Sequence, residues 1–216
     1  MNRALAWIAF EPRRLAPDGI VIMAGASGIL SVNFWRGPRS AARTRAWADQ
    51  FAATRFQASL SNPPGQGLRF VEEAVEELRA YFDGKRSVFD VSLDLSEQGT
   101  AFEQAVWEAL LTIPHGSVVS YGDVGAKIGR KSASRAVGRA IGRNPLPILV
   151  PCHRVVGKQG HLTGFSAGLR FKEILLELEG IALSPARTLS LRRVLNAPRR
   201  QVGVPAAQKQ DYILSP

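Results

Sequence analysis

The spacing of hydrophobic and polar residues predicts strands and helices in the first part of this chain. Between residues 19 and 35, two apolar runs flank a Gly-Ala-Ser-Gly turn, a pattern typical of a β-hairpin. Residues 41–56 are rich in alanine and arginine and are predicted to be helical, with Trp47 and Phe51 on one face. Four apolar residues at helical spacing predict an amphipathic helix: Val71, Val75, Leu78 and Phe82. The glycine of Asp83-Gly84 is expected to end that helix.

The pattern changes near residue 95. Before that point, residues 61–67 (SNPPGQG) have the composition of a loop, and residues 89–95 alternate apolar and polar as a strand does. After it, Thr100 and Glu103 have the spacing of a capping box, which begins a helix. The change in pattern predicts a domain boundary at this place.

Three parts of the chain are expected from these patterns. Residues 1–95 form a small N-terminal sheet-plus-helix domain, and residues 96–180 form a mostly helical C-terminal domain, which gives an α/β (α+β) fold class. Residues 181–216 contain prolines, glutamines and arginines with little periodicity. We expect this basic tail to be partly disordered.

Two short helices joined by a turn are predicted in the C-terminal domain. Ser120 and Asp123 have capping-box spacing for the first helix, and residues 129–131 (Gly-Arg-Lys) form the turn. Ser132 is expected to cap the second helix, residues 133–142 (ASRAVGRAIG). This spacing is typical of a DNA-binding helix-turn-helix.

The two faces of the second helix differ in character. Arg135 and Arg139 lie one turn apart on the face expected to be exposed. The opposite face is expected to be buried through Ala133, Ala136, Val137, Ala140 and Ile141. Ser134, Gly138 and Gly142 form a row of small residues. Such a row admits either a packed neighbouring element or a DNA backbone at close range.

Charge and composition narrow the class of partner. The net charge is +10, and residues 121–158 carry eight basic residues against one acidic residue. A polyanion such as nucleic acid suits this segment, although a solvated basic surface remains the plain alternative. No apolar run approaches the roughly 20 residues that span a bilayer, so we expect no membrane association. One cysteine cannot form an internal disulfide, so we expect a cytoplasmic location. One cysteine and three scattered histidines match no zinc spacing, so we expect no metal site and no cofactor.

The only cysteine, Cys152, lies in the stretch PILVPCHRVV between an apolar run and His153. Free cysteine is among the residues most often buried, so a small core side chain is one interpretation. The other is a nucleophile activated by its surroundings. Composition leaves both interpretations open.

The residues around this cysteine resemble a known family. NPLPILVPCHRVV, with SASRAVGRAIGRN before it, TGFSAGLRFKEILLELEG after it and SYGDVG upstream, resembles the O6-alkylguanine-DNA alkyltransferases, also called methylated-DNA–protein-cysteine methyltransferases. The resemblance is close over residues 100–180, and YFDGKRSVFDVSLDLSEQGTAFEQAVW is similar to the family's domain junction. Residues 1–70 match only in general character, although the resemblance implies a ribonuclease H-like domain there.

The resemblance implies an activity. An O6-alkylguanine, or an O4-alkylthymine, is flipped out of double-stranded DNA, and its alkyl group is transferred irreversibly to Cys152, so each molecule acts once. The resemblance implies that Glu179 orients His153, which reaches the cysteine through a bridging water. It implies that Tyr121 helps to rotate the nucleotide and protonates the leaving guanine. It also implies that Asn144 holds the tight turn before the cysteine strand. From the helical pattern alone, Glu179 would instead be an exposed residue.

The same resemblance implies how DNA and base are held. Arg135 fills the gap left by the flipped base, and the helix enters the minor groove with a set of contact residues: Ser134, Ala136, Gly138 and Arg139. The base pocket is expected to be lined by Ile141, Val155, Phe165 and Ser166. The chain departs from the family pattern in two places, because Phe165 replaces a tyrosine of some members and Ala167 replaces a common glycine. We expect the second change to narrow the pocket for bulky adducts.

The expected partner is double-stranded DNA containing O6-alkylguanine, bound by a monomer that can associate along the DNA, at the nucleoid if the chain is bacterial. Three alternatives stay open. A relative that binds lesions without reacting would lack the reactive cysteine. A cysteine hydrolase using Cys152 and His153 would leave the arginine-bearing helix unexplained. A transcription factor would need base-reading side chains, which the glycine-containing helix does not supply.

Overall fold

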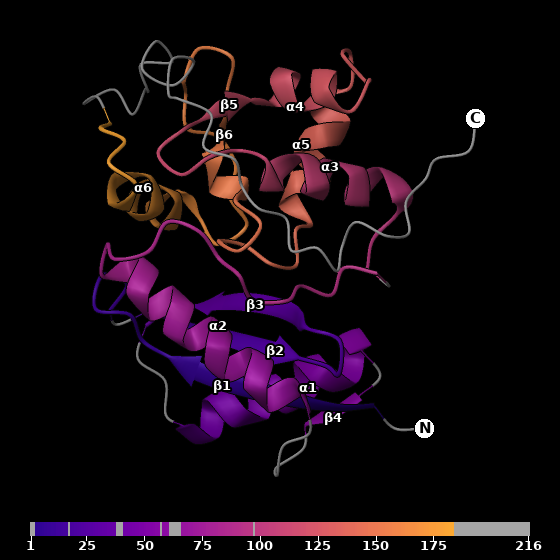
Figure 1. Ribbon diagram of the computed structural model, residues 1–216, viewed down its shortest axis with the longest axis vertical. Coiled ribbons are helices and arrows are strands. Elements are labelled where there is room, and N and C mark those ends of the chain that lie inside the picture. The colour runs from indigo at the N-terminus through magenta and orange to yellow at the C-terminus, as the bar shows by residue number, and fades with distance from the viewer. Residues whose placement is uncertain are drawn as a thin grey trace.

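The computed structural model describes residues 3–16, 18–37, 41–56, 58–60, 66–96 and 98–183. Figure 1 shows two stacked parts, which we call the sheet half (residues 3–96) and the helical half (residues 98–183). Cys152 and its neighbours belong to the helical half, and the sheet half lies against it. The domain boundary expected at residue 95 stays a prediction, because the largest hydrophobic cluster runs through both halves without a break.

The sheet half is built on four strands in the order β3-β2-β1-β4. These strands are β1 (Arg3–Phe10), β2 (Gly19–Ala24), β3 (Ile29–Trp35) and β4 (Ala58–Leu60). β2 pairs antiparallel with both β1 and β3, whereas β4 runs parallel to β1. The predicted hairpin is therefore confirmed as β2 and β3. The resemblance to ribonuclease H stays a prediction.

Helices cover both faces of this sheet. Successive residues of β2 point to opposite sides and so pack against different helices. Ile20 and Ile22 pack in the cluster that contains α2 (Gln66–Phe82), while Val21 and Met23 pack with α1 (Ala41–Phe56). Both helices were predicted. The rings of Trp47 and Phe51 stack in α1 with centroids 5.0 Å apart.

Two expectations in the sheet half were wrong. α2 already begins at Gln66, so the predicted loop extended too far, while residues 61–65 lie outside the described residues. A Cβ on Gly67 would come within 2.9 Å of the Ala24 carbonyl oxygen, so the helix starts close against β2. Residues 89–95 form no strand, because only Leu93 makes a bridge, to Ile29. The segment lies beside β3, with Val91 buried and the other apolar residues, Phe89, Leu93 and Leu95, half-buried.

The helical half contains four α-helices and a short two-stranded sheet among its described residues. The helices are α3 (Ala101–Leu111), α4 (Tyr121–Lys127), α5 (Ser134–Gly142) and α6 (Leu169–Leu178), and the 3-10 helix η1 spans Cys152–Arg154. β5 (Val119–Ser120) and β6 (Val155–Val156) pair in parallel. This pairing places the start of α4 beside the cysteine turn.

The capping boxes at Thr100 and at Ser120 are both confirmed. The predicted cap at Ser132 is wrong, because α5 begins after Ala133 and no side chain caps it. Backbone bonds shape the turn: the Arg130 N–H donates to Gly125 O of α4 at 2.7 Å, and the Ala133 N–H donates to Arg130 O at 2.9 Å.

α5 buries one face and exposes the other. Val137, Ala140 and Ile141 are buried as expected, whereas Ala133 and Ala136 are only half-buried. The Trp107 indole N–H of α3 donates to the Ala140 carbonyl at 2.9 Å, which fixes α5 on α3. In the described part of the chain, no helix combines the length and apolarity needed to cross a membrane.

Candidate active site

A tight turn delivers Cys152 to the site. The Asn144 side chain spans this turn: its Nδ2 donates to Val150 O at 2.9 Å, and its Oδ1 accepts from the Leu146 N–H at 3.0 Å. Within the turn, Ile148 has φ +77°, an unfavourable backbone conformation for a β-branched residue. Strain of this kind costs about 1–3 kcal/mol and persists only where the surroundings impose it. The arrangement fits the expected role of Asn144.

The Cys152 thiol is buried, with 3% of the residue exposed. Burial raises the pKa of the thiol to about 11, although a hydrogen bond with the Asn144 side chain and the nearby charge of Lys172 act in the opposite direction. The thiol is therefore protonated at neutral pH. A base must remove its proton before it can attack a carbon atom.

His153 follows Cys152 directly in the chain and is the candidate base, and a carboxylate holds its ring in place. Its Nε2–H donates to Glu179 Oε1 at 2.8 Å, and both side chains are fully buried. Burial lowers the pKa of His153 despite the adjacent carboxylate, so the ring is neutral. Because Glu179 holds the proton on Nε2, the lone pair is on Nδ1. Nδ1 is buried and has no hydrogen-bond partner among the described residues.

Glu179 is the centre of a buried polar network. Arg154 donates to it from Nε (2.9 Å to Oε2) and from Nη2 (2.8 Å to Oε1), and the Gly116 N–H donates to Oε2 at 3.0 Å. Tyr81 OH of α2 donates to Oε1 at 2.9 Å. Burial alone would raise the pKa of Glu179, but His153 and Arg154 outweigh it and hold the pKa well below its ordinary value. The carboxylate is thus charged and fully partnered.

Sequence reasoning missed two members of this network. Arg154 follows the cysteine and histidine directly, so its position could have pointed to it, but Tyr81 gave no signal beyond that of a packing aromatic on α2. The helical pattern placed Glu179 on the surface, and this was wrong, since only 5% of the residue is exposed. Its partners come from segments up to 98 residues away in sequence.

A cavity of about 90 Å³ opens in front of the thiol. It is lined by Tyr121, Gly138, Ile141, Gly142, Cys152, Gly164, Phe165 and Ser166. The structure therefore brings most of the predicted pocket and catalytic residues together. A Cβ on Gly138 would lie 3.6 Å from the Tyr121 ring, an ordinary van der Waals distance, so the ring lies against this part of α5. The Tyr121 OH donates to Thr163 O at 3.3 Å.

Val155 is not part of that lining. It is fully buried, and its carbonyl accepts from the Lys172 Nζ at 2.5 Å. The same ammonium donates to Thr163 O at 2.8 Å, so it ties the cysteine segment to the opposite wall of the pocket. Burial lowers the pKa of Lys172 to about 8. Lys172 is a further residue of the site that the sequence did not reveal.

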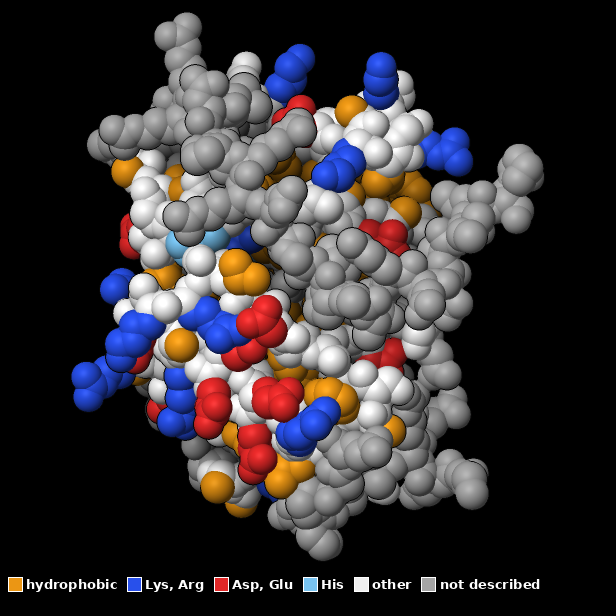
Figure 2. Space-filling model, in the orientation of Figure 1, with side chains coloured by type: hydrophobic (Ala, Val, Ile, Leu, Met, Phe, Trp, Pro, Cys, Tyr) orange, Lys and Arg blue, Asp and Glu red, His pale blue; other side chains and the backbone are white. Residues whose placement is uncertain are grey.

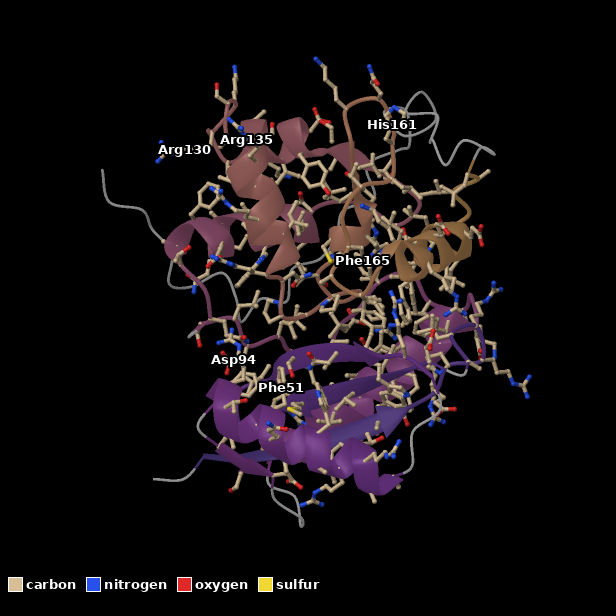
Figure 3. All side chains as sticks on the ribbon, turned by 180° about the vertical axis from the view of Figure 1, so that it is seen from behind. Phe51, Asp94, Arg130, Arg135, His161 and Phe165 are labelled. Atoms are coloured by element: carbon tan, nitrogen blue, oxygen red, sulfur yellow. The ribbon has the colours of Figure 1, made fainter. Side chains whose placement is uncertain are left out.

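The basic surface lies beyond the pocket, on the helix-turn-helix. Arg135 and Arg139 are exposed on α5, as is Ser134, while Ala136 and Gly138 are half-buried. Figure 3 shows Arg130 and Arg135 projecting from the end of the helical half that faces away from the sheet half, whereas Phe165 lies near the junction of the halves. In Figure 2, acidic side chains gather instead over α2, which contains four glutamates.

No group of three or more histidine, cysteine or acidic side chains among the described residues is arranged to hold a metal ion.

Comparisons with known proteins agree with this geometry. Residues 101–181 match the family model "6-O-methylguanine DNA methyltransferase, DNA binding domain". A methylated-DNA–protein-cysteine methyltransferase of Methanosarcina acetivorans is 40% identical over 166 residues, which cover 76% of this chain and 94% of the relative. The crystal structure of Mycobacterium tuberculosis O6-methylguanine methyltransferase superposes with a TM-score of 0.62 at 36% identity, covering 81% of this chain and 92% of that one. A structure of Mycobacterium tuberculosis OGT in complex with DNA gives a TM-score of 0.61 at 35% identity, covering 82% and 92%. The chain belongs to the methylated-DNA–protein-cysteine methyltransferase family.

Proposed function

We propose that this protein repairs O6-alkylguanine, and O4-alkylthymine, in double-stranded DNA by transferring the alkyl group to Cys152. The observation that carries the proposal is the position of the only cysteine. It lies at the wall of a small cavity, backed by a buried histidine and carboxylate and adjoined by a helix with exposed arginines. No separate acceptor is needed, so each molecule reacts once.

The chemical step is a displacement at the alkyl carbon. The thiol proton passes through a water molecule to His153 Nδ1, and the resulting imidazolium is stabilised by Glu179. The thiolate then forms a carbon–sulfur bond while the bond between the alkyl carbon and guanine O6 breaks. Tyr121 protonates the departing base and regains a proton from solvent, while the His153 imidazolium releases its proton to solvent, so the net proton moves from the thiol to guanine. The product is a stable thioether.

The helix-turn-helix supplies the access to the base. Arg135 enters the duplex where the base has left, while Arg139 and the small residues of α5 lie along the groove. Unstacking a base costs a few kcal/mol, which such an insertion offsets in part. Contacts to the phosphates serve a repair protein well, because a lesion can occur in any sequence.

The remaining organisation follows the same proposal. We place the domain boundary at residue 95, ahead of α3, and expect a monomer on DNA. A location in the cytoplasm, at the nucleoid in a bacterium, suits a protein that must keep one thiol reduced.

The test is a mass measurement. Protein is incubated with a duplex carrying one O6-methylguanine, and the intact protein is weighed beside Cys152→Ala. A single added methyl group, mapped to Cys152 and absent from the variant, is the expected result. Tight binding of the lesion without any added mass would overturn the transfer and leave a lesion sensor. Release of more than one methyl equivalent per molecule would contradict the single-use step.

A further inference from the structure

One wall of the cavity is a loop, residues 164–168, that the sheet half holds from outside. Arg36 follows β3 directly and donates from Nη2 to the Ala167 carbonyl at 2.8 Å. Its guanidinium lies so close to Gly168 that a Cβ built there would come within 2.0 Å of Nη2. Gly168 also has φ +100°, a conformation that favours glycine. The loop and the arginine therefore fit each other closely.

Further contacts fasten the residues beside the loop. Arg170 of α6 pairs with Asp18, and Asp18 Oδ1 in turn accepts from the Gly37 N–H at 2.7 Å. Asp18 is buried, so the pair is anchored on the sheet half. Asp18 therefore links Gly37, just after β3, to Arg170 in the first turn of α6.

An aromatic contact fastens the pocket side of the loop. The ring of Phe34 in β3 meets Phe165 edge-on, with centroids 6.1 Å apart, and lies 4.8 Å from Phe171. Phe165 itself lines the cavity beside Cys152. Two side chains of the sheet half, Phe34 and Arg36, thus contact the loop, and Asp18 holds Arg170 just beyond it.

The cavity beside Cys152 is too small for an alkylated base. Its volume is about 90 Å³, whereas a cavity of about 150 Å³ holds a single benzene ring. A flipped guanine carrying an alkyl group needs more room than that. An outward movement of the loop would make this room, and a larger alkyl group would require a larger movement.

We propose that Arg36 is a specificity-determining residue, which holds the pocket loop inward and so disfavours large alkyl groups. This inference rests on the proposed alkyl transfer. Arg36 touches neither thiol nor base; it acts through the Ala167 carbonyl and is a positioning residue. The hydrogen bond from Arg36 to Ala167 breaks completely only when the loop is displaced far. The need to break it therefore slows the reaction of large adducts more than that of small ones.

The test compares two lesions in one duplex sequence, O6-methylguanine and O6-benzylguanine, by single-turnover rate constants. Arg36→Ala should raise the ratio of the benzyl to the methyl rate constant by about fivefold, the effect of losing one hydrogen bond at an exposed site. Arg36→Lys keeps the charge and one donor group and should restore part of the wild-type ratio. Arg45→Ala is the matched control, because Arg45 is a partly exposed arginine of the sheet half that pairs with Asp49 and lies over Trp7.

Hydrogen exchange supplies a second measurement. Amides of residues 164–170 should exchange faster in Arg36→Ala than in the wild type and in Arg45→Ala, while the rest of the helical half is unchanged. An unchanged benzyl-to-methyl ratio in a folded Arg36→Ala protein that still repairs O6-methylguanine would overturn the inference and leave the proposed function standing. Failure of the wild type to accept a methyl group would overturn the proposed function instead.

Discussion

The buried thiol should be unreactive toward simple alkylating reagents in the absence of DNA, and raising the pH should make it reactive. The pKa of Cys152 is about 11, against an ordinary value of 9.0. At pH 7.5 the thiolate is then about 3 molecules in 10,000, compared with about 3% for an ordinary cysteine. The difference of two pKa units corresponds to an approximately 100-fold lower thiolate population, and limited access to a residue 3% exposed slows the reaction further.

The assay uses iodoacetamide and intact mass, which report on one residue because the chain has one cysteine. The rate constant should rise about tenfold per pH unit from pH 7 to pH 9.5, as the thiolate fraction does. Protein unfolded in urea should react about 100-fold faster at pH 7.5. A rate constant that levels off near pH 7 would show a thiolate already formed, and would refute the reasoning from burial.

Three other predictions concern the relay and the helix. Glu179→Gln leaves a buried guanidinium without its counter-charge, so the free energy of unfolding in urea should fall by about 3–5 kcal/mol, whereas Glu177→Gln, at an exposed position of α6, should change it little. Arg135→Ala should slow repair of a duplex lesion by about tenfold or more, since flipping loses its support, and should slow reaction with free O6-benzylguanine far less; equal slowing of both would contradict the role. Because the pKa of His153 is lowered in the folded protein, the unfolded chain binds a proton that the native state does not, so stability should fall as the pH drops below about 6.5; denaturation midpoints that do not fall between pH 7.5 and pH 5.5 would count against a buried neutral ring.

The features that could be predicted from sequence are those set by nearby residues. The capping boxes at Thr100 and Ser120 need partners only three positions away, and the hairpin needs only its turn. The segment 89–95 was mistaken for a strand because an alternating pattern does not reveal whether a partner strand is present, and only Leu93 makes a bridge. The cap at Ser132 was wrong because α5 begins after Ala133, one residue beyond the predicted cap position.

The candidate site divides in the same way. The residues around Cys152 carried enough of a family pattern to predict a nucleophile and a tyrosine, which the structure places at one cavity, and an arginine-bearing helix. The sequence pattern could not reveal that Glu179 is buried. The partners of its carboxylate, Tyr81 and Arg154, come from other parts of the fold. Lys172 likewise looks like an ordinary helical lysine until the fold buries it beneath the pocket.

A nucleophile that can be used once is best kept protonated until its substrate arrives, and the structure accounts for this by position. The same burial that raises the pKa of Cys152 also keeps His153 neutral, with its lone pair on the nitrogen that faces away from Glu179. Thiol and base are thus both in the protonation state that precedes proton transfer. The sheet half contacts the site at two separate places: Tyr81 donates to the Glu179 carboxylate, and Arg36 donates to the pocket loop. It is therefore part of the reacting unit, since it touches both the proton relay behind the thiol and the wall in front of it.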